Sequence, residues 1–124
     1  MPDSTSTVQE LREAMARFVR ERDWEQFHSP KNRVMGLSVE AAELTEHFLW
    51  IDNEASRAVA GDPAKVGEIA DEMADVACYL LALAITLGLD LSDAVTRKLA
   101  KNALKYPAER VRGRYRLEDA GGES

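Results

Sequence analysis

The stretch KNRVMGLSVEAAELTEHFLWI, residues 31–51, places two glutamates, Glu40 and Glu43, in a largely apolar helical pattern. A second stretch, PAKVGEIADEMADVACYLLALAITL at 63–87, carries Glu72 and Asp75 at the same spacing. Residues three apart share one side of a helix, so each pair of carboxylates points in one direction. The two stretches match at an offset of 32 residues, acid on acid and apolar on apolar. This repeat predicts two paired helices related by a pseudo-two-fold axis.

Each stretch also has a predicted apolar stripe beside its acids. The stripes are Leu37, Ala41, Leu44, Phe48 and Ile51 on the first helix, and Ile69, Met73, Val76, Leu80, Leu83 and Leu87 on the second. Most charged pairs on helices face solvent, but apolar residues bracket these acids. If the stripes pack together, four carboxylates converge at the edge of the core, where they repel one another and are costly to desolvate. A divalent cation would offset that cost, and an all-oxygen ligand set favours magnesium or manganese.

The composition is that of an ordinary globular protein. The 124 residues fit a single domain, 1–124, with flexible tails expected at 1–7 and 108–124. The net charge of −6 argues against nucleic acid or an anionic membrane as a partner. The first ten residues are polar and the longest apolar run, 76–87, is too short to cross a bilayer, so we expect a cytoplasmic protein. A single cysteine, Cys78, permits no intrachain disulfide.

Capping and proline signals predict four main helices. They are expected at 8–22, from the Ser29-Pro30 pair to 51, from the Asp62-Pro63 pair to Gly88, and from Asp90 to 105 or 106. Residues 52–62 read as a loop, and no strand pattern appears. The predicted fold is therefore an all-α four-helix bundle.

The predicted fourth helix carries Lys98, Asn102 and Lys105 on one face. Two ammonium groups and an amide in a row suit a chain of phosphates, although lysines on a helix more often face only solvent. Beyond it, arginines alternate along the chain before acidic residues offset them: Arg110, Arg112, Arg114 and Arg116. We expect a solvated tail, with docking onto an acidic surface or over a chain of phosphates as the alternatives.

The run ERDWEQFH at 21–28 interrupts the helical pattern with three rings, Trp24, Phe27 and His28. On the residues alone, Trp24 and Phe27 either cap the core or line a pocket. Four apolar residues outside the stripes predict a further contact surface and hence a homo-oligomer: Val39, Leu49, Leu81 and Ile85.

ExxE on one helix followed by ExxD on the next resembles the MazG-like, all-α nucleoside triphosphate pyrophosphohydrolases. The runs ERDWEQFH, FLW at 48–50 and KYPA at 105–108 are similar to the dCTP pyrophosphatase branch of that superfamily, and the resemblance covers roughly residues 11–107. It implies magnesium-dependent hydrolysis of a (deoxy)nucleoside triphosphate, dCTP or a modified dCTP, to the monophosphate and pyrophosphate. This reaction would remove unwanted nucleoside triphosphates from the nucleotide pool, a house-cleaning role. The resemblance further implies a homodimer or homotetramer with sites completed across subunits.

The resemblance also implies roles for individual residues. The metal-binding and catalytic residues would be Glu40, Glu43, Glu72 and Asp75, with Glu43 the candidate base. The substrate-binding residues would be Trp24, His28, Trp50, Tyr79, Lys98, Asn102 and Lys105. Trp24 and Trp50 would sandwich the base, and a polar group such as His28 or a backbone carbonyl would read its edge. Some animal members carry histidine where this chain has Met15, which weakens the transfer of strict cytosine specificity.

Three alternatives stay open at this point. Within the enzyme class, the substrate is dUTP or a broad set of deoxynucleotides. Outside it, the acids form the binding surface of a non-catalytic helical interaction module, a reading that leaves Trp24, Trp50 and Lys98 unexplained. A di-iron carboxylate bundle fits less well, because it needs histidine three residues after glutamate and His47 follows Glu43 by four.

Overall fold

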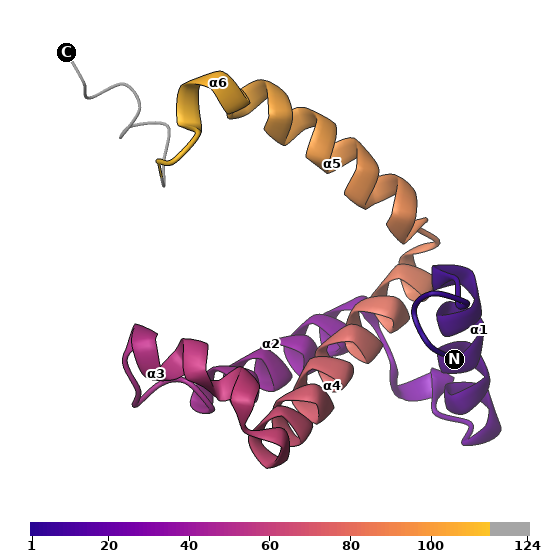
Figure 1. Ribbon diagram of the computed structural model, residues 1–124. Coiled ribbons are helices and arrows are strands. Elements are labelled where there is room, and N and C mark those ends of the chain that lie inside the picture. The colour runs from indigo at the N-terminus through magenta and orange to yellow at the C-terminus, as the bar shows by residue number, and fades with distance from the viewer. Residues whose placement is uncertain (115–124) are drawn as a thin grey trace. The chain divides into compact units, whose positions relative to one another are not determined.

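The computed structural model describes residues 1–114, which contain helices and turns but no strand (Figure 1). The longer helices are α1 (Val8–Glu21), α2 (Pro30–Glu46), α4 (Pro63–Leu87) and α5 (Leu91–Lys105). The shorter ones are the 3-10 turns Glu25–Phe27 and Val59–Gly61 and the helices α3 (Asn53–Ala58) and α6 (Ala108–Val111). The all-α prediction is confirmed.

The chain divides into two compact units, of which the first is Met1–Leu89 and the second begins at Asp90. Helices α1 to α4 belong to the first unit, and α5 and α6 to the second. The four-helix bundle, which requires α5 to pack on the first unit, stays a prediction, as does the single domain 1–124.

Side-chain caps begin the helices where the sequence predicts. Ser29 Oγ accepts a hydrogen bond from the Asn32 amide (3.1 Å) ahead of α2, and Asp90 Oδ1 accepts one from the Asp93 amide (2.8 Å) ahead of α5. Both satisfy amides that a helix start leaves without partners. At the other end of α4, Gly88 adopts φ = 66°, a left-handed conformation that glycine takes without steric cost.

The prediction that the second helix reaches residue 51 is wrong, because α2 ends at Glu46. The amides of His47 and Phe48 bond to carbonyls only three residues back, at 3.3 and 2.9 Å, which tightens the last turn. Asp52 then caps a new helix through the Ala55 amide (2.8 Å). The predicted loop 52–62 therefore contains α3 and a 3-10 turn, since a capping aspartate starts a helix whether or not the flanking sequence is apolar.

The expected C-terminal tail, 108–124, also contains a helical turn, α6, which follows Pro107. Proline favours the start of a helix because its fixed φ is already helical and no amide is lost. Arg116 and the acidic residues after it lie outside the described residues.

Helices α2 and α4 pack side by side and antiparallel (Figure 1). Gly36 lies against the ring of Tyr79, while Glu40, one turn further along α2, approaches Glu72, which comes earlier in α4. Helix α1 packs against α4 as well. Arg12 of α1 donates hydrogen bonds to the carbonyls of Ala84 and Leu89, at the C-terminal end of α4. The predicted hairpin of acidic helices is confirmed.

The predicted apolar stripes are buried only in part. On α2, Glu40 is half-buried together with Leu37 and Leu44, whereas Ala41 is exposed. On α4, Ile69 is buried and Met73 is 56% exposed. Since several neighbouring residues are apolar, the sequence does not define the centre of the buried face, which depends on where the partner helix lies. Glu40 and Glu72 consequently lie within the α2–α4 interface, whereas Glu43 and Asp75 are exposed.

The apolar residues outside the stripes have different surroundings. Leu81 is buried and Ile85 half-buried within the chain, so neither belongs to the predicted contact surface. Val39 and Leu49 are 57% and 55% exposed and remain available for it. Among residues 1–114, no single helix is long and apolar enough to span a membrane; α4 and α5 reach that length and composition only when taken together.

Replacing Gly36 with alanine should displace the Tyr79 ring. A Cβ at position 36 would lie 2.6 Å from Tyr79 Cζ, well inside van der Waals contact. Alanine adds about 0.5–1 kcal/mol of helix propensity, but such overpacking costs about 1–3 kcal/mol. We therefore expect Gly36→Ala to lower the thermal midpoint measured by circular dichroism.

Gly67→Ala in α4 is the matched control, because a Cβ there meets no atom within 4 Å. It should stabilise the protein by about 0.5–1 kcal/mol through propensity alone. Equal stabilisation by both substitutions would contradict the close approach of α2 to Tyr79.

Candidate functional site

Three of the four predicted metal-binding carboxylates come together across the α2–α4 interface. Glu40 and Glu43 on α2 and Glu72 on α4 each offer one oxygen, and these oxygens all lie within 4.8 Å of one another. Glu40 and Glu72 are half-buried, while Glu43 is exposed. We call these three residues the carboxylate cluster.

The carboxylate cluster carries uncompensated negative charge. Oε2 of Glu40 and Oε2 of Glu72 are buried and lack a hydrogen-bond partner in the part of the chain that is described. Desolvation is the largest cause that raises the pKa of both residues above its ordinary value, and the neighbouring Glu43 adds to it. Buried oxygens without donors, in an all-carboxylate set, fit a divalent cation, so the cluster could bind a metal ion.

Asp75, the fourth predicted ligand, lies outside the carboxylate cluster. Its negative charge nevertheless contributes to raising the pKa of Glu40 and Glu72. Asp75 lines a neighbouring cavity instead. Cys78, also in that cavity, has its pKa raised by burial and secondarily by Asp75, which disfavours the nucleophilic thiolate.

The cavity has a volume of about 530 Å³ and a mostly apolar lining from α1, the 24–28 turn, α2 and α4. Three of the predicted substrate-binding residues line it, namely Trp24, His28 and Tyr79. Met15 lines it too. This volume lies within the range of small-molecule sites. We call it the aromatic cavity.

The end of α1 positions Trp24. Asp23 adopts φ = 53°, the left-handed conformation that aspartate tolerates better than most residues. The amides of Asp23 and Trp24 then bond to the carbonyls of Arg20 (3.0 Å) and Val19 (3.1 Å). This pair of bonds is a Schellman motif, which reverses the chain so that Trp24 returns towards the helix it follows.

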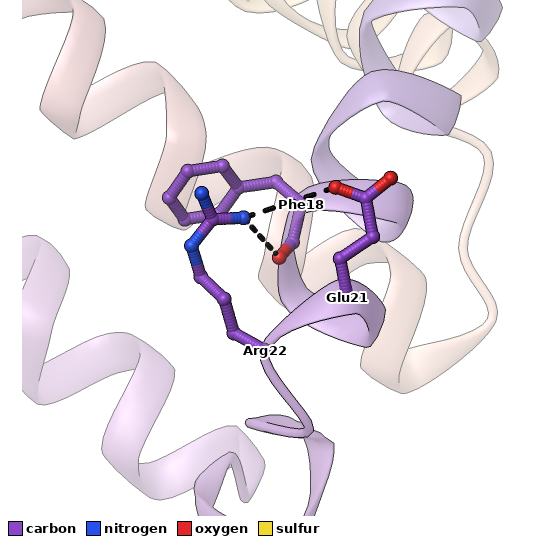
Figure 2. Close-up of polar contacts among 3 residues, drawn as sticks. All are labelled: Phe18, Glu21 and Arg22. Atoms are coloured by element: carbon purple, nitrogen blue, oxygen red, sulfur yellow. Dashed lines mark hydrogen bonds and ion pairs between the residues drawn. The ribbon is translucent and has the colours of Figure 1, made fainter.

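Ring contacts continue from this turn, and Figure 2 shows Phe18 at their start with Arg22 and Glu21 beside it. The Arg22 guanidinium lies 3.7 Å from the Phe18 ring centroid and donates to the Phe18 carbonyl at 3.0 Å, with Glu21 at 4.0 Å. The rings of Phe18 and Trp24 meet edge to face, with centroids 5.9 Å apart, and Trp24 meets His28 in the same way at 6.4 Å. These contacts orient the rings that line the aromatic cavity.

Arg33 is the lining residue that the sequence reasoning missed. It lies in the first turns of α2 and is only 5% exposed. Burial lowers the pKa of Arg33, and burial together with the charge of Arg33 lowers the pKa of His28. A signal was present in the sequence, because Arg33 precedes Leu37 by four residues and Glu40 by seven and thus shares their face of the helix.

The remaining predicted substrate-binding residues are not part of the aromatic cavity. Trp50 follows α2 and is 88% exposed. Lys98, Asn102 and Lys105 share one face of α5, in the second unit, where Lys105 Nζ lies 5.3 Å from the Tyr106 ring centroid. Their roles at the site stay predictions.

The raised pKa values predict that the metal-free protein loses stability as pH rises. A carboxyl group whose folded pKa is raised stabilises the fold below its ordinary value of 4.5, and this stabilisation is lost as pH climbs towards the folded pKa. Glu72→Gln, which is always neutral, should therefore have a higher thermal midpoint than wild type at pH 7 without metal, and the two should converge near pH 4.

Saturating magnesium should reverse that order at pH 7, because it stabilises the wild type more than Glu72→Gln. Glu46→Gln is a suitable control, since Glu46 is exposed on the same hairpin and outside the carboxylate cluster. A lower midpoint for Glu72→Gln at pH 7 without metal would indicate that Glu72 already has a compensating partner.

The chain is similar in sequence and in fold to known proteins. The sequence profile of the MazG-like family matches residues 36–116. The chain is 38% identical to dCTP pyrophosphatase 1 of Bos taurus and 37% identical to that of Homo sapiens, in both cases over 110 residues, or 89% of its length. These alignments span about 65% of the length of either relative.

A solved structure is similar over nearly its whole length. It is a pyrophosphatase from Archaeoglobus fulgidus that is 32% identical to this chain, with a TM-score of 0.73 over 86% of this chain and 98% of the other. The profile match and the identity to these relatives lead to one conclusion: the chain belongs to the MazG-like family.

Proposed function

We propose that the protein is a magnesium-dependent nucleoside triphosphate pyrophosphohydrolase. Its substrate would be a deoxynucleoside triphosphate, dCTP or a modified dCTP, and its products the monophosphate and pyrophosphate. The observation that carries the proposal is that the carboxylate cluster and the aromatic cavity share neighbouring residues of α4. Glu72 belongs to the carboxylate cluster, and Asp75 and Tyr79, one and two turns further on, line the aromatic cavity. The names of the relatives, dCTP pyrophosphatase and pyrophosphatase, support this reaction.

Each part suits one portion of the substrate. Glu40, Glu43 and Glu72 would hold a divalent cation, which when bound supplies positive charge for the phosphates and makes nearby water more acidic. Trp24, His28 and Tyr79 would enclose the base, because aromatic side chains stack on flat rings. The phosphate chain would then extend from the cavity towards the cluster.

In the reaction, water attacks the α-phosphorus, the α–β phosphoanhydride bond breaks, and pyrophosphate leaves. Glu43 is the exposed member of the carboxylate cluster and so can orient the attacking water or accept its proton. Lys98 and Asn102, with Lys105, would bind the departing phosphates as hydrogen-bond donors. Asp75 would stand between the base and the reacting phosphate.

We further propose that the active form is a homodimer or homotetramer. Trp50 is 88% exposed and Leu49 and Val39 more than half exposed, an apolar surface that favours association. An exposed tryptophan beside the hairpin would then stack on the base held by a second copy, which completes the predicted sandwich with Trp24.

Pyrophosphate release from dCTP, dUTP, dTTP and dATP tests the function. We expect magnesium or manganese to support hydrolysis, exhaustive chelation to abolish it, and dCTP to give the highest kcat/KM. Full activity after chelation would contradict the metal assignment. A preference for dUTP would support the hydrolase assignment but contradict the preference for cytosine. Nucleotide binding without turnover would favour the non-catalytic interaction module.

Glu43→Gln should reduce kcat by about 100-fold or more, as is usual when a charged group acts on the reacting centre. The amide is nearly isosteric, so the thermal midpoint should not fall. Glu46→Gln, one turn along α2 and exposed, should retain activity. Equal activity of Glu43→Gln and Glu46→Gln would contradict a catalytic role for Glu43.

Trp50→Ala should raise KM for dCTP and reduce its advantage over other nucleotides, while the magnesium dependence stays unchanged. The protein should sediment above the monomer mass at micromolar concentration, since Trp50 acts on the base of another copy. Full activity at the monomer mass would contradict the shared site.

A further inference from the structure

Arg33 is a buried cation without a partner. It is 5% exposed, and its Nε is buried without a hydrogen-bond acceptor. Throughout residues 1–114, its guanidinium takes part in no hydrogen bond or ion pair. A guanidinium stays charged in proteins and carries five N–H donors, and leaving such donors unsatisfied is costly. A group that supplies acceptors would remove this cost.

The surroundings of Arg33 suggest where the acceptors come from. Arg33 lines the aromatic cavity together with Trp24, His28 and Tyr79. Asp75 lines the same cavity but is not within the 4.0 Å of an ion pair with Arg33. Arg33 also borders a second cavity, of about 400 Å³, that contains Arg20 and Glu25. Only the first cavity combines flat aromatic walls with a position next to the carboxylate cluster.

The geometry of guanidinium selects the kind of acceptor. Its parallel N–H groups form a planar fork, which pairs best with two neighbouring acceptors in one plane. Cytosine has such a pair in N3 and the O2 carbonyl. Uracil and thymine carry N3–H at the same place, so the fork would meet a donor and leave buried N–H groups unpaired.

We propose that Arg33 reads the N3 and O2 edge of cytosine in the aromatic cavity and is the specificity-determining residue for dCTP over dUTP. This inference rests on the proposed pyrophosphohydrolase function and assigns to Arg33 the edge-reading role otherwise expected of His28 or a backbone carbonyl. Met15, in the same cavity, has no donor with which to compete for that edge.

The test compares kcat/KM for dCTP, dUTP and 3-deaza-dCTP, which lacks the N3 acceptor, on wild type and Arg33→Leu. A bidentate contact discriminates between bases by about 10- to 100-fold. Arg33→Leu should lose about that factor on dCTP and change by only a few fold on dUTP. Wild type should use 3-deaza-dCTP poorly, whereas Arg33→Leu should treat it like dCTP.

Lys31→Leu is the matched control, since it removes a positive charge from the same helix at an exposed position and should retain the preference for dCTP. Arg33→Leu should stay folded, because replacing an unpaired buried charge by an apolar side chain is neutral or stabilising, and its thermal midpoint checks this.

Different failures are distinguishable. If folded Arg33→Leu keeps the wild-type ratio of kcat/KM for dCTP to that for dUTP, the edge-reading role is overturned while the hydrolase function stands. An equal loss of kcat/KM on every nucleotide overturns it too, because Arg33 would then bind the phosphates. If wild type hydrolyses no nucleotide, the proposed function fails. Calorimetric titration with dCMP and dUMP then still tests Arg33, because only wild type should bind dCMP more tightly.

Discussion

The packing of α2 against α4 determines the rest of the first unit. Gly36 permits the close approach, since any larger residue would collide with the Tyr79 ring. The same approach brings Glu40 and Glu72 together in the interface, with buried oxygens that no donor among residues 1–114 satisfies. Burying carboxylate oxygens without a partner costs stability. Such a cost is typical of functional sites.

Helix α4 links the two halves of the candidate site. Glu72 of the carboxylate cluster and the cavity residues Asp75 and Tyr79 follow one another along about 10 Å of this helix, at 1.5 Å per residue, so one rigid element holds both parts. Tyr79 lies on the same helix, whereas Trp24 follows the Schellman turn that ends α1 and His28 comes soon after it. A site built from a helix and a capped turn keeps its geometry without a long loop.

The chain buries little apolar surface by itself. Val19, Ile69 and Leu81 are the large apolar residues that are buried among residues 1–114, whereas Trp50, Leu49 and Met73 are more than half exposed. A single copy with so small a core gains limited hydrophobic stabilisation. Association would bury part of this surface, and the same surface lies on the hairpin that carries the carboxylate cluster.

The sequence alone determined the four longer helices and the acids that they carry. Serine, aspartate and proline caps act locally, so the starts of α2, α4 and α5 follow from neighbouring residues, and the repeat of Glu40 and Glu43 in Glu72 and Asp75 is visible in one dimension. Local signals did not reveal where α2 ends. Only tertiary structure decided that Glu40 lies inside the interface, that Asp75 faces the cavity and that Arg33 is buried without a partner. These outcomes depend on which side of each helix meets its neighbour, and a helix with apolar residues on several sides leaves that choice to packing.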